Sequence, residues 1–554
     1  MSENYFDLGR YQRSITAASD QAQTWFNRGL NWCYGFNQEE AVRCFKKAIE
    51  LDPECAMAYW GVAYAAGPFY NKPWDWYGEQ ERIEAAKTCY KYAQLALQLK
   101  DRVSAVERRL IEALCQKHPA AQGELETMLQ WPKDYAEVMR SVYEDFPDDL
   151  EVICLTAESL MNLTPWKLWD LDKGIPAHNA CTEESIAILQ HGVDLIKDRN
   201  LQQHPGIVHF YIHVFEMSPT PERALPLADE LRDLCPECGH LLHMASHVDA
   251  LCGQWQEAVL ANTRAIKADL NYFELRGTGE FYMISALHNF HFKMYAAMFL
   301  GQFEAAKSAA DGLRALVTDD MLKIDERYLA STLEAYYSSG IHVLVRFGLW
   351  QEITEEAFPD NQTLYPITTI LLHYAKTIGY AALGDIDTAR EHKQQFESCY
   401  KTVPDWHLVA NNPTRNILRV AEAMMNGELE YHAGNHDLGY EFLREATHLS
   451  DQLEYSEPWP WMHPPRHALG ALLLEQGHVV EALQHYEDDL GLNPTLPRCV
   501  QHRDNIWALH GYHECLKRLN RHDEAELIKP RLDIALARSD IKVTSSCCCR
   551  KHTI

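Results

Sequence analysis

The stretch AQTWFNRGLNWCYGFNQEEAVRCFKKAIELDP, residues 22–53, has the pattern of a 34-residue helix–turn–helix repeat. Gly29 and Ala41 are small residues at the positions where the two helices of such a repeat approach each other closely. Pro53 stands where the second helix ends, because proline lacks the amide hydrogen that continues a helix. The stretch therefore predicts a pair of packed helices. With Ala22 as position 1, the matching residues are Trp25, Gly29, Trp32, Ala41, Phe45, Ala48 and Pro53.

The same 34-residue frame recurs along the chain, with degenerate helical pairs between the clear copies. Strand signals are sparse, so we predict an all-α fold, an α-solenoid in which each repeat buries its apolar face against its neighbours. Three stretches rich in Trp and Pro, residues 67–80, 164–180 and 453–467, are expected as insertions. The alanine of position 20 recurs at Ala224, Ala258, Ala306, Ala482 and Ala525.

The chain is expected to consist of five segments. The last, 541–554, is expected to be a flexible tail rich in cysteine, and Lys551 in the fourth place from the end excludes a prenylation box. Reversible palmitoylation of Cys547–Cys549 and an unmodified tail are both open at this point. The other segments are an N-terminal extension (1–21), repeats with insertions (22–200), histidine-rich repeats that hold the candidate site (201–320) and C-terminal repeats (321–540).

Composition excludes several classes of protein. The 554 residues carry a formal net charge of −28, which argues against the broad basic face that nucleic acids or anionic membranes require. No run of 18 apolar residues and no apolar N-terminal segment is present, so neither a transmembrane helix nor a secretory signal is expected. The 16 cysteines are scattered without a disulfide framework, as in a reducing compartment. We therefore expect a cytoplasmic protein.

Histidines cluster in two stretches, HPGIVHFYIHVFEMS (204–218) and CGHLLHMASHVDALCG (238–253). His209 and His243 are 34 residues apart, as are His213 and His247, so each pair occupies equivalent positions in consecutive repeats. The spacings i, i+4, i+7 and i, i+3, i+7 place each trio on one helix face. The first trio is His209, His213 and Glu216, the second is His240, His243 and His247, and His288 and His291 follow in the next repeat.

These patterns resemble the tetratricopeptide-repeat proteins, which implies a right-handed superhelix. The resemblance also implies that positions 2, 5, 9 and 12 of each first helix, where the histidines and Glu216 fall, line its concave surface. The middle of the chain further resembles a histidine-rich family of bacterial and fungal repeat proteins distantly similar to human tetratricopeptide repeat protein 38. Fungal relatives are sometimes encoded near natural-product genes, which implies a tailoring step in secondary metabolism. The stretches that carry this likeness are AESLMNLTPWKLWD (157–170), HPGIVHFYIHVFEMSPTPERAL (204–225), GHLLHMASHV (239–248) and ALHNFHF (286–292).

The histidine cluster is expected to bind a transition metal ion, Fe, Cu or Zn, because neutral imidazole is a good ligand for all three. Glu216 would be a further ligand or the catalytic acid–base group. The alternative is a groove of hydrogen-bonded neutral histidines that binds an anion or a peptide. The expected metal ligands are His209, His213, His243 and His247, with His240, His288 and His291 as contacts to the ligands or to a substrate.

Two functions from different classes follow. The first is a metal-dependent oxidoreductase or hydrolase that acts on a small organic molecule. The second is a scaffold that binds a partner peptide along its concave groove. Insertions that cap the groove favour the first, and an open groove favours the second. Trp459 and Trp461 lie in such an insertion, where they either close a pocket over the groove or only seal the loop onto the core.

Overall fold

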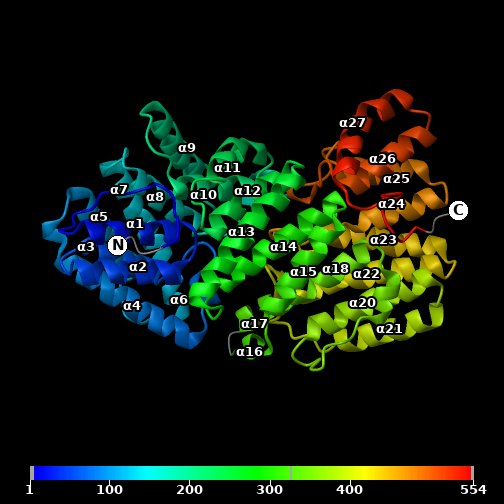
Figure 1. Cartoon of the computed structure of the whole chain (residues 1–554), viewed down its shortest axis with the longest axis horizontal. Helices are drawn as coiled ribbons and strands as arrows, with labels where there is room; N and C mark the ends of the chain where they lie inside the picture. Colours follow the sequence, from blue (N-terminus) through cyan, green and yellow to red (C-terminus); the bar gives the residue numbers. More distant parts are fainter. Residues whose placement is uncertain (1–4, 325–326, 551–554) are drawn as a thin grey trace. The chain divides into compact units, whose positions relative to one another are not determined.

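The computed structural model describes residues 5–324 and 327–550 (Figure 1). Helices dominate this part of the chain, and its strands form only two short hairpins, so the predicted all-α fold is confirmed. The chain divides into two compact units. Unit 1 comprises Met1–Val248 and Arg264–Ala286, and unit 2 comprises Asp249–Thr263 and Leu287–Ile554. The histidine-rich segment predicted at 201–320 is thus divided between them.

Unit 1 is built from consecutive helices that pack on their neighbours in sequence, as repeat proteins do. A hairpin of β1 (Trp169–Asp170) and β2 (Ile175–Pro176) lies in the predicted insertion 164–180. The helices are α1 (Asp20–Tyr34), α2 (Gln38–Leu51), α3 (Ala56–Ala65), α4 (Glu79–Gln98), α5 (Ala105–Lys117), α6 (Leu125–Met128), α7 (Trp131–Asp145), α8 (Leu150–Met161), α9 (Thr182–Asp198), α10 (Pro205–Glu216) and α11 (Leu225–Leu231), with short 3₁₀ turns at Trp74–Trp76, Lys100–Arg102 and Pro221–Ala224. Three further helices contain the boundaries between the units: α12 (Gly239–Leu251), α13 (Trp255–Arg276) and α14 (Met283–Leu300).

Unit 2 continues the same architecture, and it also contains one hairpin, formed by β3 (Leu408–Val409) and β4 (Asn412–Pro413). Long helices such as α20 and α22 pack on several neighbours and form its centre. Its helices are α15 (Phe303–Leu316), α16 (Asp319–Leu322), α17 (Arg327–Ser338), α18 (Gly340–Arg346), α19 (Trp350–Glu355), α20 (Pro366–Leu383), α21 (Ile386–Tyr400), α22 (Thr414–His432), α23 (His436–Asp451), α24 (Pro465–Glu475), α25 (Val479–Asp489), α26 (Ile506–Arg518) and α27 (His522–Arg538), with a 3₁₀ turn at Arg498–Val500.

The first repeat shows why the small residues of the pattern are needed. The ring of Phe45 on α2 is fully buried between α1 and α3. A Cβ atom at Gly29 would lie 2.7 Å from this ring, and one at Gly61 would lie 2.5 Å from it. Only glycine leaves room for the aromatic ring at both positions, so three helices close around one side chain.

The segment Arg264–Ala286 belongs to unit 1 because its side chains bind those of the first repeat. Arg43 donates a hydrogen bond of 2.7 Å to the hydroxyl of Tyr272, and both are held by the carboxylate of Glu280. Arg276 donates to both oxygens of the buried Glu40 at 2.8 Å. Such bidentate charged pairs are specific in geometry, so they define where this returning segment docks.

The C-terminal segment departs from the expected flexible tail over residues 541–550. Cys549 is 1% exposed and Ser546 is buried, where its hydroxyl pairs with that of Tyr486 at 2.5 Å. Arg550 donates to Glu514 at 2.9 Å. These contacts hold the segment against unit 2, and nothing in them supports the lipidation considered from the sequence. Residues 551–554 lie outside the described part of the chain.

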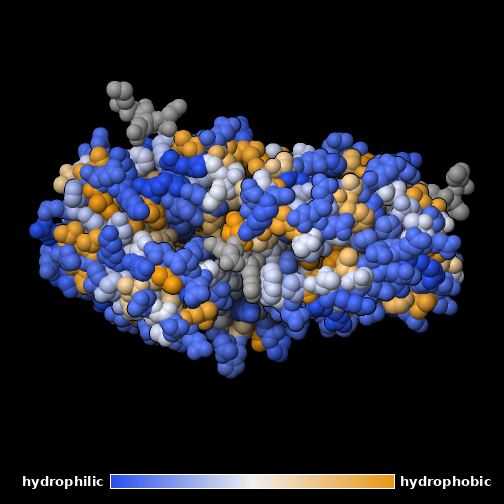
Figure 2. Space-filling view, turned by 90° about the horizontal axis from the view of Figure 1, so that it is seen from below, coloured by the Kyte–Doolittle hydropathy of each residue, from blue (hydrophilic) through white to orange (hydrophobic). Residues whose placement is uncertain are grey.

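Polar residues cover most of the face shown in Figure 2, with hydrophobic residues scattered in small groups. This agrees with the large negative charge of the chain. Among the described residues, no helix is both long and apolar enough to cross a membrane.

One buried carboxyl group in α22 gives unit 2 a dependence of stability on pH. Glu428 is 1% exposed, neither of its oxygens accepts a hydrogen bond from another described residue, and burial raises its pKa to about 8. The folded state therefore binds this proton more tightly than the unfolded state, whose carboxyl has its ordinary pKa near 4.5. The stability that this tighter proton binding contributes is fully present below pH 4.5 and is lost as the pH rises through 8.

Glu428→Gln is therefore expected to raise the urea midpoint of unfolding relative to the parent at pH 9 and to change it little at pH 5. The control is Glu441→Gln, because Glu441 is exposed on the neighbouring α23 and its substitution should be neutral at both values. An equal effect of Glu428→Gln at pH 5 and pH 9 would show that this carboxyl does not titrate as described.

Candidate metal centre

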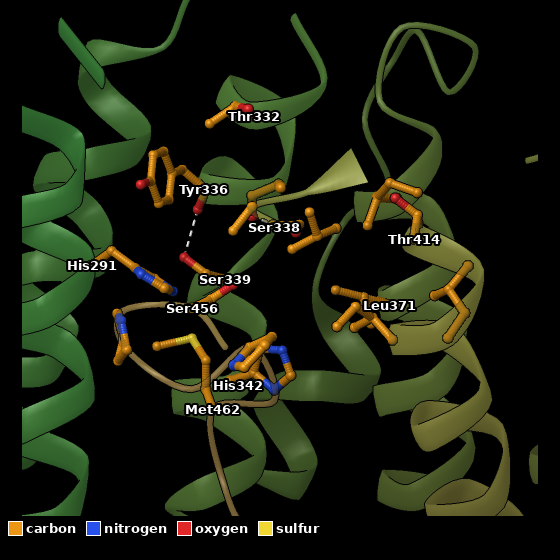
Figure 3. A pocket seen from close by; sticks show the side chains of 18 of the residues that line it. His291, Thr332, Tyr336, Ser338, Ser339, His342, Leu371, Thr414, Ser456 and Met462 are labelled. Atoms are coloured by element: carbon orange, nitrogen blue, oxygen red, sulfur yellow. Dashed lines mark hydrogen bonds between the residues drawn. The ribbon is translucent and has the colours of Figure 1, made fainter. Parts of the chain in front are cut away.

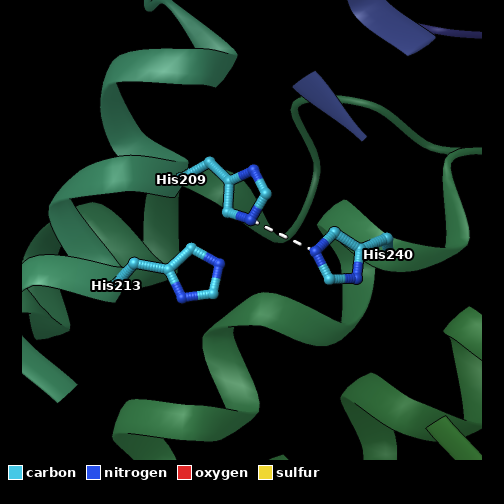
Figure 4. Close-up of side chains that lie close together, drawn as sticks. All are labelled: His209, His213 and His240. Atoms are coloured by element: carbon cyan, nitrogen blue, oxygen red, sulfur yellow. Dashed lines mark hydrogen bonds between the residues drawn. The ribbon is translucent and has the colours of Figure 1, made fainter. Parts of the chain in front are cut away.

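The predicted histidines of α10 and α12 meet inside unit 1. Figure 4 shows His209 and His213 on α10 facing His240 on α12. All of the histidines of the two predicted trios, and Glu216, are at most 3% exposed. The helices α10 and α12 begin at Pro205 and Gly239, which are 34 residues apart, the period of the predicted repeat. The 34-residue spacing therefore brought equivalent positions of two helices face to face.

The ring nitrogens stand at spacings that suit a shared ion. Nε2 of His209 lies 3.2 Å from Nε2 of His240, and one nitrogen from each of His209, His213 and His240 lies within 4.8 Å of the others. For comparison, two nitrogens on a tetrahedral zinc ion, with bonds of 2.0–2.1 Å, stand about 3.3–3.4 Å apart. The first pair is close to this separation, and the third imidazole would move toward the other two on binding the ion.

A backbone carbonyl defines the tautomer of His209. Its Nδ1 lies 2.6 Å from the carbonyl oxygen of Tyr34, at the end of α1. A carbonyl oxygen only accepts hydrogen bonds, so Nδ1 carries the hydrogen and Nε2 presents its lone pair to the cluster. Burial, and secondarily the neighbouring His213, holds the pKa of His209 well below its usual range. This imidazole is therefore neutral, the form that binds metals.

Glu216 bridges the two helices through both of its carboxylate oxygens. Oε1 lies 2.8 Å from Nδ1 of His213, and Oε2 lies 2.5 Å from Nδ1 of His247. An ionised carboxylate only accepts, so both imidazoles donate from Nδ1 and keep a lone pair on Nε2. In metal sites, such carboxylate–histidine pairs orient the ligands and raise their basicity.

His243 and His247 form the closest pair, with their Nε2 atoms 2.7 Å apart. The hydroxyl of Ser246 donates to the carbonyl oxygen of His243 at 2.7 Å and lies 3.3 Å from Nδ1 of the same residue. Because Glu216 holds the hydrogen of His247 on Nδ1, Nε2 of His247 accepts a hydrogen bond from Nε2 of His243. A metal ion that bound both nitrogens would displace this hydrogen.

Aromatic rings of the N-terminal repeats close one side of the cluster. The ring of Phe36 stacks on His240 at 5.0 Å between centroids and on His213 at 5.9 Å. Tyr70 contacts His213 at 4.8 Å. Phe36 has a φ of 53°, and a Cβ at the preceding Gly35 would lie 2.1 Å from the sulfur of Cys238. The turn after α1 therefore approaches the start of α12 closely enough to cover the imidazoles.

His204, the residue before α10, has partners outside the cluster. His204 caps α10, where its Nδ1 accepts from the amide of Ile207 at 3.1 Å, and its Nε2 donates to the buried Glu151 at 2.9 Å. His288 and His291 belong to unit 2, where His291 lines a pocket. The roles predicted for these two residues at the cluster stay predictions.

Sequence reasoning missed Tyr34, Phe36 and Ser246. Ser246 lies three residues after His243 and so on the same helix face, which is a signal that could have been used. The carbonyl of Tyr34 leaves no trace in the sequence, because any residue supplies one. Phe36 comes from a repeat distant in sequence, and its contact with the cluster depends on how the helices pack.

Comparisons with known proteins support the repeat and little beyond it. Residues 22–55 match the tetratricopeptide repeat family, which confirms the repeat predicted from residue 22. No curated protein matches the chain, so the narrower likeness to a histidine-rich family finds no support. The anaphase-promoting-complex hetero-tetramer Cut9–Hcn1 aligns at 12% identity over 94% of this chain and 88% of that one, with a TM-score of 0.29. Naa15/Naa10 bound to HypK-THB aligns at 12% identity over 93% and 70%, with a TM-score of 0.22. Likenesses this low carry no argument about function.

Proposed function

We propose that unit 1 binds a transition metal ion through the histidine cluster of α10 and α12. The observation that carries the proposal is the buried trio His209, His213 and His240, in which one ring nitrogen of each lies within 4.8 Å of the others. Nδ1 of His209 donates to a carbonyl and Nδ1 of His213 donates to Glu216, so both imidazoles present an Nε2 lone pair. Lone pairs that converge in a buried space are what a metal ion requires.

The donor atoms favour particular ions. Neutral imidazole suits zinc, copper and iron, and hard cations such as magnesium and calcium prefer oxygen ligands. Glu216 is engaged by two imidazoles through both of its oxygens, which supports a positioning role rather than direct binding of the metal. We propose His209, His213, His243 and His247 as the residues that bind the metal directly, with His240 beside His209.

A bound ion would supply Lewis-acid or redox chemistry, and we propose a small organic molecule as its substrate. The residues of this chain would hold the ion in a buried, aromatic-walled site, which excludes water from the reaction. A tailoring role in natural-product metabolism rests on the family resemblance alone. The scaffold that binds a partner peptide remains the alternative, supported by the repeat match at residues 22–55.

The test is the metal content of untagged protein, measured by inductively coupled plasma mass spectrometry. The parent is expected to hold about one equivalent of zinc, copper or iron, and His209→Ala/His243→Ala to hold less than about a tenth of that. The control, His178→Ala/His522→Ala, also removes two histidines, but both are exposed and it should retain the metal. Circular dichroism checks that each variant is folded. Absence of metal from the parent, even after incubation with each ion, would contradict the proposal and favour the scaffold.

A further inference from the structure

Unit 2 contains a pocket of its own, lined by α14, α17, α18, α20, α22 and the segment after α23 (Figure 3). Its empty volume is about 670 Å³ with the open solvent at its mouth included. Most of its wall is apolar. The apolar residues include Ile367, Leu371, Ile417, Leu418 and Met462.

Three polar atoms at this pocket have no hydrogen-bond partner among the described residues. They are Nδ1 of His291, Oγ1 of Thr332 and Nδ1 of His342, all buried from solvent. Thr332 is only 4% exposed and His342 only 5% exposed. Buried polar groups without a partner are costly and rare in folded proteins. Their gathering around one cavity therefore indicates a ligand that supplies the missing hydrogen bonds.

The charge of the lining limits the ligand. Burial lowers the pKa of both His291 and His342 to about 3, so the two imidazoles are neutral at ordinary pH. Neither lysine nor arginine is among the described residues that line the pocket, and Glu457 contributes a carboxyl group to its wall. An anionic ligand would lose its hydration without gaining a cationic partner and would also face this carboxyl group, which is unfavourable.

The Trp- and Pro-rich insertion builds one wall of the pocket. Ser456, Pro460 and Met462 line it. Trp459 is buried and donates from Nε1 to the carbonyl of Ser450 at 3.1 Å, and the buried Trp461 packs edge-to-face on His342 at 4.7 Å. The tryptophans thus fasten the loop to the core while their neighbours face the cavity.

We propose that this pocket binds a largely apolar small organic molecule that carries no negative charge and whose polar group hydrogen-bonds to Thr332 and to the imidazoles of His291 and His342. The site lies within unit 2, and the proposal is independent of the metal centre of unit 1.

The test compares two fluorinated probes of nearly equal shape, 4-fluorophenol and fluorobenzene, by ¹⁹F NMR titration of the full chain. Only the phenol carries a hydroxyl, so it is expected to bind about fivefold tighter, the value of one net hydrogen bond. Equal affinity for the two probes, or no saturable binding of either, would overturn the proposal.

Two variants assign the binding to this pocket. Thr332→Val keeps the shape but removes the hydroxyl, so it should reduce the preference for the phenol to below about twofold while raising thermal stability. Its control is Thr377→Val, since the buried hydroxyl of Thr377 already donates to the carbonyl of His373 at 2.8 Å, outside the pocket. This control should keep the preference and gain no stability.

Leu371→Phe should narrow the cavity and weaken the binding of both probes. Leu383→Phe, at an exposed position 51% accessible on the same α20, is the matched control and should leave binding unchanged. Survival of the preference in both Thr332→Val and Leu371→Phe would show that the probes bind elsewhere and would overturn the proposal.

Discussion

Replacing Glu151 by glutamine is expected to lower the free energy of unfolding of unit 1 by about 3–5 kcal/mol, as when one partner of a buried charge network is removed. Glu151, on α8, is 1% exposed. Its carboxylate accepts from the hydroxyls of Tyr11 at 2.9 Å and Tyr34 at 2.7 Å and from Nε2 of His204 at 2.9 Å. Glutamine would turn an NH₂ group toward these donors, so at least one of them would lose its acceptor inside the protein.

The pKa of Glu151 shows how strongly these partners bind the ionised form. Burial by itself raises this pKa, but His204 and Arg13 more than offset the effect and bring it to about 2. A carboxyl with a lowered pKa in the folded state stabilises the fold above its unfolded value near 4.5, and this stabilisation is lost as the pH falls toward 2. The cost of Glu151→Gln should therefore be largest at neutral pH and shrink below pH 4.5.

Hydrogen exchange of the peptides that cover α8 and α10 is the suitable measurement, because it reports on unit 1 separately from the rest of the chain. The control is Glu184→Gln. Glu184 also pairs with an arginine, Arg140 at 2.7 Å, but its side chain is 39% exposed, so its loss should cost less than about 1 kcal/mol. Equal protection in the parent and in Glu151→Gln would mean that the buried carboxylate adds nothing to stability.

Glu216→Gln is expected to weaken metal binding by about 10–100-fold, the usual effect of removing a carboxylate that orients histidine ligands. A glutamine can accept from only one of His213 and His247. The other imidazole would face an NH₂ group, which favours a hydrogen on Nε2 and removes the lone pair that should bind the ion. This prediction rests on the proposed metal centre.

The affinity of the Glu216→Gln variant for Zn²⁺ can be measured by competition with a chromophoric chelator. Glu183→Gln serves as the control because Glu183 is exposed in the first turn of α9, and it should bind zinc like the parent. If Glu216→Gln also binds zinc like the parent, Glu216 does not orient the ligands.

The sequence predicted the helices that carry the candidate site better than it predicted the residues that surround the site. The 34-residue period and the i, i+4 spacing are local properties of the chain, so they sufficed to place His209, His213, His243 and His247 on facing sides of two helices. Tyr34 contacts the cluster at α10 and Phe36 contacts it at α10 and α12, so both contacts depend on how the end of α1 approaches these two helices, which no local pattern encodes.

Local reasoning did not predict the contacts of the C-terminal segment. The segment 541–550 is short, polar and rich in cysteine, a composition typical of a flexible end. Its order comes from partners far away in sequence, such as Tyr486 and Glu514. The pocket of unit 2 was equally hidden, because its polar atoms come from separate helices that the sequence does not relate.

The discontinuous make-up of unit 1 has a consequence for protein synthesis. Its first repeat binds Arg276 and Glu280 through Glu40 and Arg43, yet the ribosome adds those partners more than 200 residues later. At about 5–20 residues per second, the first repeat waits for tens of seconds before its partners emerge. A chain truncated after Val248 would lack the segment Arg264–Ala286. No single truncation of the coding sequence therefore yields unit 1 alone and complete.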